Sequence, residues 1–185
     1  MFRSLWSELG GTIAGSFREA PTPPNARPLA ETVSPSLAEV LRDMNKWSNN
    51  IIARQLLATL GALSEPGENS PAAGARAAQR ALQASGIDTT GLVIENGSGL
   101  SRKERTSAAM LGQLLLSAWH GRTMPELMAS LPIAGLDGTA RRRVAGSGTA
   151  GFAHIKTGTL DDVRSLAGYV LARDGQRYAV VLMIN

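Results

Sequence analysis

Two short groups of polar residues in the sequence carry side chains that could act on a peptide ligand. The first is Lys156-Thr157-Gly158-Thr159, placed at the end of a predicted strand. A lysine on a strand presents a fixed cation to a carboxylate, threonine hydroxyls add donors, and a glycine lets an extended ligand approach the strand backbone. Such a short string occurs often by chance, so alone it favours an ordinary exposed strand-end lysine.

The second group is Ser48-Asn49-Asn50, far upstream of the first. A serine hydroxyl near a lysine can relay a proton, and an asparagine carboxamide offers a donor and an acceptor to a substrate amide. Taken alone, an ordinary helix cap explains this triplet better than a functional role does.

The triplet lies between two predicted helices. Leu37, Val40, Leu41 and Met44 have helical spacing, and Ser34-Pro35 predicts the start, with serine as cap and proline at the first helical position. That helix ends near Trp47, and a second apolar-periodic run extends over residues 51–60. The triplet is therefore expected on a tight turn between two packed helices.

The middle of the chain predicts a strand, a turn and a helix. Residues 92–94 read as a strand that enters the glycine-containing turn 96–99. Ser101 with Glu104 has the form of a capping box, which predicts a helix continuing through Leu115.

The last third of the chain predicts a sheet. Residues 163–171 and 178–184 read as strands, and Asp174-Gly175 between them is a typical hairpin turn. Together with the strand ending at Lys156, they predict at least three consecutive antiparallel strands.

Taken together, the two groups match the motif set of serine β-lactamases and penicillin-binding proteins. The wider strings, residues 44–50, 96–102 and 154–159, closely resemble in order and spacing those of the class C low-molecular-mass penicillin-binding proteins. These are the D-alanyl-D-alanine carboxypeptidase/endopeptidases. The resemblance covers essentially the whole chain. It implies an α/β (α+β) protein with a partial β-lactamase/transpeptidase-like fold over residues 1–185, in which helices pack on an antiparallel sheet.

The resemblance also implies roles for individual residues. Lys156 would anchor the terminal carboxylate of a peptidoglycan stem peptide with help from Thr157, and Gly158 would lie against the bound peptide. The backbone N–H of Thr159 would supply half of an oxyanion hole. Ser48 and Asn50 would handle proton transfer and bind the substrate amide. Residues 96–102 would either shape the cleft or serve as a structural turn and cap.

One motif of the family, Ser-x-x-Lys, does not occur in the sequence. The lysines are Lys46, Lys103 and Lys156, and none has a serine three positions before it. The chain is therefore expected to lack the amino-terminal segment with the nucleophile, and also the family's closing carboxy-terminal helix, and to form no acyl-enzyme alone. Asn49 replaces the aspartate common in the family, a change expected to be tolerated.

Composition excludes several other classes of protein. The net charge is +4 and the pI about 10.1, but the one dense cluster, residues 141–143, has no interleaved aromatic residues, so nucleic acid is not an expected partner. With no cysteine and two histidines, neither a metal nor another cofactor is expected. No signal peptide or transmembrane segment is predicted.

The expected partners are peptidoglycan stem peptides and β-lactams, and the full-length family member is expected in the periplasm or cell envelope. The sequence leaves the oligomeric state open. Two alternatives to an inactive enzyme fragment also stay open: a non-catalytic muropeptide-binding module or remnant, and an unrelated α/β protein in which the matched strings are structural.

Overall fold

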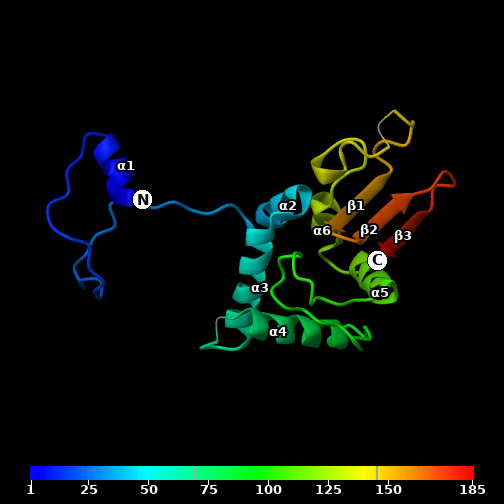
Figure 1. The fold of residues 1–185 in the computed structure, drawn as a ribbon, viewed down its shortest axis with the longest axis horizontal. Helices are drawn as coiled ribbons and strands as arrows, with labels where there is room; N and C mark the ends of the chain where they lie inside the picture. Colours follow the sequence, from blue (N-terminus) through cyan, green and yellow to red (C-terminus); the bar gives the residue numbers. More distant parts are fainter. Residues whose placement is uncertain (69, 145) are drawn as a thin grey trace. The chain divides into compact units, whose positions relative to one another are not determined.

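The regular structure is six α-helices, one short 3₁₀ helix and three strands, counted over residues 1–68, 70–144 and 146–185, which the computed structural model describes (Figure 1). None of these helices has the length and hydropathy needed to cross a bilayer. In chain order the elements are α1 (Phe2–Glu8), α2 (Leu37–Trp47), α3 (Asn50–Ser64), α4 (Pro71–Ala84), α5 (Ala108–Trp119), α6 (Met124–Ser130), η1 (Gly138–Ala140), β1 (Ala153–Leu160), β2 (Val163–Leu171) and β3 (Arg177–Ile184).

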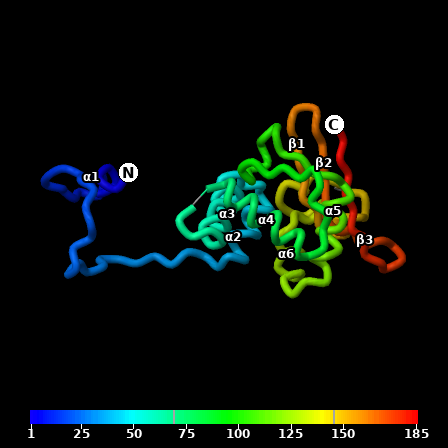
Figure 2. Tube along the Cα trace, turned by 90° about the horizontal axis from the view of Figure 1, so that it is seen from below, coloured from blue at the N-terminus to red at the C-terminus, as the bar shows by residue number. Residues whose placement is uncertain are grey.

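The chain divides into two units, residues 1–34 and 35–185 (Figure 2). The first unit contains α1, which buries none of its residues, followed by a stretch without regular structure that includes the proline-rich residues 21–28. The second unit holds every other element, together with all the residues singled out in the sequence for chemistry.

Helix α2 begins two residues later than the sequence predicted. Ser36, not Ser34, is the cap: its hydroxyl accepts from Glu39 N–H and the Glu39 carboxylate accepts from Ser36 N–H, which makes a capping box. Pro35 therefore precedes the helix instead of occupying its first position. The capping box is the more stable start because it satisfies two backbone N–H groups. A proline at the first helical position satisfies none; it only lacks an N–H that would otherwise be unpaired.

The three strands form one antiparallel sheet in the order β1-β2-β3, which confirms the predicted sheet. The register pairs Lys156 with Ala167 and Gly158 with Ser165. Gly175 adopts a positive φ of 80° in the hairpin between β2 and β3, as expected of a glycine in such a turn.

One face of the sheet is covered by α5 and α6. Leu115 of α5, Leu131 and Tyr169 of β2 form a buried cluster against which Ala179 and Val181 of β3 pack. The Tyr169 hydroxyl donates to the Leu115 carbonyl oxygen at 2.7 Å. A polar tip on a buried ring is thus satisfied, and β2 is fixed against the helix behind it.

Two predictions for the middle of the chain are wrong. Residues 92–94 form no strand, because pairing is limited to one bridge between Val93 and Arg105 before the chain turns. Ser101 does not cap a helix, since its hydroxyl contacts the Glu95 carboxylate, and α5 begins later with Ser107 accepting from Met110 N–H. The Ser101 hydroxyl therefore bonds to the Glu95 carboxylate instead of capping a helix.

Helices α3 and α4 approach each other closely through two buried glycines. A Cβ at Gly61 would lie 2.7 Å from the backbone nitrogen of Gly74, and a Cβ at Gly74 would clash with the Leu57 carbonyl oxygen. The absent side chains let the two backbones come into direct contact. This contact matters for the site because α3 begins at Asn50.

We expect Gly74→Ala to lower the free energy of unfolding by about 1–3 kcal/mol, because the added methyl group must separate α3 from α4. Chemical denaturation of the 185-residue chain measures this change. Gly112 of α5 is the matched control, since a Cβ there meets no atom within 4 Å. Gly112→Ala should stabilise the chain by about 0.5–1 kcal/mol, the ordinary gain in helix propensity. Equal effects at both positions would contradict the close contact.

Candidate active site

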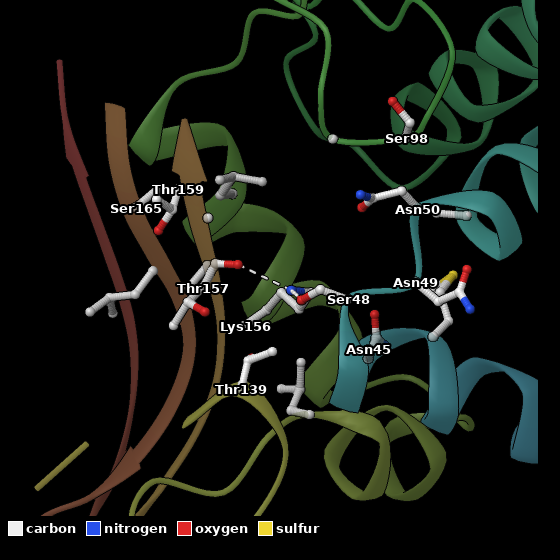
Figure 3. Close-up of a pocket in the computed structure, with 18 of the residues that line it drawn as sticks. Asn45, Ser48, Asn49, Asn50, Ser98, Thr139, Lys156, Thr157, Thr159 and Ser165 are labelled. Atoms are coloured by element: carbon white, nitrogen blue, oxygen red, sulfur yellow. Dashed lines mark hydrogen bonds between the residues drawn. The ribbon is translucent and has the colours of Figure 1, made fainter. Parts of the chain in front are cut away.

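A cleft of about 850 Å³ lies where the α2–α3 corner, the turn 96–100, the η1 region and strands β1 and β2 meet (Figure 3). Its polar lining brings together the residues that the sequence singled out from distant parts of the chain, namely Ser48, Asn49, Asn50, Lys156, Thr157, Gly158 and Thr159. Residues 97–100 of the third matched string also line it.

The two sequence groups touch through one contact. The Lys156 ammonium Nζ donates to Ser48 Oγ at 2.5 Å and to the Thr157 carbonyl oxygen at 3.1 Å (Figure 3). Ser48 ends α2 in the left-handed conformation, with φ of 53°, which is uncommon for a residue with a side chain. The tight corner between α2 and α3 therefore sets where the hydroxyl points.

Lys156 is the fourth of eight residues in β1, not the last residue of a strand as predicted. The strand continues because its pairing with β2 runs to Leu160 opposite Val163. The edge of β1 away from β2 is bonded to residues 132–134 up to Ile155, whose N–H donates to the Pro132 carbonyl oxygen at 2.8 Å.

The rest of that edge faces the cleft. Alternate residues of a strand point their backbone groups to the same edge. The N–H groups of Thr157 and Thr159 therefore point to the same edge as the N–H of Ile155, beyond the stretch that residues 132–134 cover. This open edge can accept an extended peptide as an added strand.

The two asparagines of the corner have different neighbours. Asn49 caps α3, with its Oδ1 accepting from the N–H groups of Ile51 and Ile52 at 3.1 Å each. An aspartate can make the same cap. Asn50 fits its surroundings when its side-chain nitrogen donates to the Ser98 carbonyl oxygen at 2.9 Å and to the Ser48 carbonyl oxygen at 3.2 Å. Asn50 thereby ties the corner to the turn 96–99.

The turn 96–99 is held in place by its own polar contacts. The Glu104 carboxylate accepts from Gly97 N–H at 3.2 Å, and Asn96 Oδ1 accepts from Ser98 N–H at 2.9 Å. Gly97 has a positive φ of 71°, and a Cβ there would lie 3.1 Å from the Leu57 side chain. The segment is thus both a structural turn and a wall of the cleft.

A partly buried ion pair that the sequence did not reveal fixes the other side of the corner. Lys46 Nζ donates to Asp137 Oδ2 at 2.6 Å and to the Leu131 carbonyl oxygen at 2.7 Å. The other oxygen of Asp137 accepts from Ile133 N–H at 2.7 Å, and Ile133 bridges to His154 of β1. Asp137 is far from Lys46 in the sequence, so no local pattern signals this pair.

The charges of the cleft favour an anionic ligand. Among the described lining residues, the charged side chains are Lys156 and Arg143, and there is no carboxylate. Burial lowers the pKa of Lys156. For Asp137, burial raises the pKa but hydrogen bonds from Lys46 and Ile133 N–H together outweigh it, so the pKa is lowered. The described residues contain no grouping of acidic or histidine side chains suited to a metal ion.

Comparisons with known proteins agree on one family. The model of the D-Ala-D-Ala carboxypeptidase 3 (S13) family matches residues 1–185. A D-alanyl-D-alanine carboxypeptidase of Actinomadura sp. (strain R39) is 33% identical over 184 residues, which are 95% of this chain and 34% of that protein. Carboxypeptidase DacB of Mycolicibacterium smegmatis is 36% identical over 165 residues, which are 85% of this chain and 35% of that protein.

A solved structure shares the fold. Penicillin binding protein 4 from Haemophilus influenzae, complexed with a β-lactam, superposes with a TM-score of 0.85 at 28% identity. The match covers 100% of this chain and 42% of that chain. The chain thus has part of that fold, as predicted, and it spans about a third of the length of the curated relatives named above.

We expect Asp137→Asn to lower the free energy of unfolding by about 1–3 kcal/mol near neutral pH, because the Lys46 ammonium, whose side chain is 11% exposed, loses its anionic partner. Since the pKa of Asp137 is lowered, its stabilisation is present above the ordinary carboxyl pKa and is lost as the pH falls. The unfolding free energies of the unsubstituted chain and of Asp137→Asn should therefore become equal in acid.

The matched control is Asp43→Asn, because the Asp43 side chain is 63% exposed in its pair with Arg42. Asp43→Asn should lower the unfolding free energy by less than about 0.5 kcal/mol. Denaturant unfolding over a range of pH values measures both variants. A loss of unfolding free energy at Asp137 no larger than at Asp43 would contradict the role of the Lys46–Asp137 pair.

We expect Lys156 to lose its proton at a lower pH than a solvent-exposed lysine, because burial disfavours its charged form. The folded state then binds fewer protons than the unfolded state between the lowered and the ordinary pKa, so unfolding free energy should rise with pH across that window. NMR titration of ¹³C-methylated lysines, assigned with Lys156→Arg, measures the pKa. A value at or above the ordinary lysine pKa would refute the expectation.

Proposed function

The chain belongs to the D-Ala-D-Ala carboxypeptidase 3 (S13) family, and we propose that it carries the substrate-binding part of a serine-type D-Ala-D-Ala carboxypeptidase/endopeptidase. Such an enzyme cleaves peptidoglycan stem peptides through an acyl-enzyme that β-lactams also form. Residues 1–185 are then part of a larger transpeptidase-like domain. Because peptidoglycan lies in the cell envelope, the periplasm or envelope is the proposed place of action.

The observation that carries this proposal is the contact between Lys156 Nζ and Ser48 Oγ at the open edge of β1. A lysine and a serine from separate elements meet there within a cleft that has two cations and no carboxylate among its described lining residues. In a half-buried site of this kind, a cation attracts a carboxylate more strongly than it would in bulk water. The terminal carboxylate of a peptide is the ligand group that fits this end of the cleft.

The backbone of β1 supplies the second part of the proposed site. A peptide that adds to the open edge can bond to the backbone groups of Thr157 and Thr159, and Gly158 offers no side chain to obstruct it. The Thr159 N–H is then placed to donate to the oxygen that becomes negative when the scissile carbonyl is attacked. Thr157 contributes a hydroxyl near the anchored carboxylate.

The α2–α3 corner supplies the proposed proton path. Ser48 Oγ already accepts from Lys156, so its own hydroxyl proton can pass to a leaving amine while the lysine supplies a replacement. Because burial lowers the pKa of Lys156, its ammonium gives up a proton more readily than that of a solvent-exposed lysine. In the orientation given above, the Asn50 nitrogen is engaged by Ser98 and Ser48, which leaves its carboxamide oxygen to accept from a substrate amide.

Covalent chemistry needs a nucleophile that these groups do not include. None of the three lysines follows a serine by three positions, so we propose that the 185 residues alone form no acyl-enzyme. A non-catalytic muropeptide-binding module is the second candidate, because the carboxylate anchor and the open edge suffice for binding without cleavage.

We expect a stem peptide ending in D-Ala-D-Ala to bind the 185-residue chain in calorimetry, and Lys156→Ala to weaken binding at least about tenfold because a charged hydrogen bond is lost. Lys103→Ala is the matched control, since the Lys103 side chain is 79% exposed and pairs with Glu95. Equal losses in the two variants would contradict a specific anchor at Lys156.

Fluorescent penicillin separates the catalytic and binding forms of the proposal. The chain alone should remain unlabelled after denaturing electrophoresis. Covalent labelling that maps to a serine of this chain would overturn the statement that the nucleophile lies outside these residues, and the absence of peptide binding would overturn the binding role.

A further inference from the structure

Ser165 of β2 lies on the same sheet face as Lys156, although neither sequence group includes it. Its direct partner across the strands is Gly158, and Lys156 pairs with Ala167 two positions along β2. Directly opposed residues and alternate residues along a strand share one face of a sheet. Lys156, Gly158 and Ser165 therefore lie on one face, and Ser165 lines the cleft (Figure 3).

Gly158 leaves open the space that the Ser165 hydroxyl occupies. A Cβ built at Gly158 would clash with Ser165 Oγ, whereas the Ser165 Cβ would be 3.8 Å away. The hydroxyl thus lies over the backbone of β1 at the middle of the predicted ligand-binding string. Any larger residue at position 158 would displace it.

The Ser165 hydroxyl is free to bond to a ligand. Side-chain hydrogen bonds from β2 within the described residues come from Arg164 and Tyr169, which leaves Ser165 Oγ without a partner. The residue is half-buried and borders a cleft whose described charges are both positive. A neutral hydroxyl in the same cleft as these cations can donate to an anion bound there.

We propose that Ser165 is a further ligand-binding residue, whose hydroxyl donates through the gap at Gly158 to the carboxylate anchored by Lys156. This inference rests on the proposed function and extends it by one residue outside the recognised strings. It makes Ser165 a determinant of selectivity for ligands with a free carboxylate over neutral ones, because the donated bond is strongest to an anion.

The test compares a stem peptide ending in D-Ala-D-Ala with the same peptide ending in a carboxamide, by calorimetry on the 185-residue chain. Ser165→Ala should weaken binding of the carboxylate peptide about tenfold and of the carboxamide peptide at most about twofold. Ser117→Ala is the matched control, since Ser117 is exposed on α5 and does not line the cleft; it should change neither affinity. On the unsubstituted chain, NMR should show a larger shift of the Ser165 amide signal with the carboxylate peptide than with the carboxamide peptide.

The outcomes separate this inference from the proposed function. Loss of carboxylate binding in Lys156→Ala but not in Ser165→Ala would overturn the inference and leave the proposed function standing. Equal losses for both peptides in Ser165→Ala would show a packing role and would also overturn it. No binding of either peptide to the unsubstituted chain would overturn both.

Discussion

The site depends on the partly buried ion pair between Lys46 and Asp137. Ser48 is two residues beyond Lys46, and Asp137 belongs to the segment that bonds to β1 just before Lys156. The pair therefore fixes the distance between two groups that lie far apart in the sequence. A partly buried ion pair contributes little net stability compared with an apolar pair of the same volume, but its directional hydrogen bonds favour one arrangement of its partners.

The same segment covers one part of the β1 edge and leaves the part that lines the cleft open. Residues 132–134 run antiparallel to β1, with Pro132 opposite Ile155, so the covered part of the edge ends where the chain comes from α6. At the other end of the segment, Asp137 turns the chain toward Lys46. Gly138 allows this return, since a Cβ there would lie 2.5 Å from the Lys46 carbonyl oxygen. The start of this segment thus ends the covered part of the edge, and the turn at its other end holds the corner.

Local signals in the sequence predicted the elements well and their partners poorly. Strand β2 and the hairpin at Gly175 followed from alternation and turn chemistry, which act over a few residues. The predicted start of α2 and the predicted capping role of Ser101 were wrong, because several polar side chains near each position can form the same kind of hydrogen bond. The ion-pair partner of Lys46 is set by a long-range contact, and the position of Ser165 opposite Gly158 is set by strand register. A single sequence reveals neither.

The contacts that shape the cleft lie within residues 35–185. Ser36 and Asn49 cap the two helices of the corner, Asn50 ties it to the turn 96–99, and Lys46 ties it to β1 through Asp137. These contacts are made between folded elements of one unit and require neither ligand nor nucleophile. Binding to such a preorganised site costs little further ordering, so the proposed recognition of an anionic peptide end does not depend on the proposed covalent step.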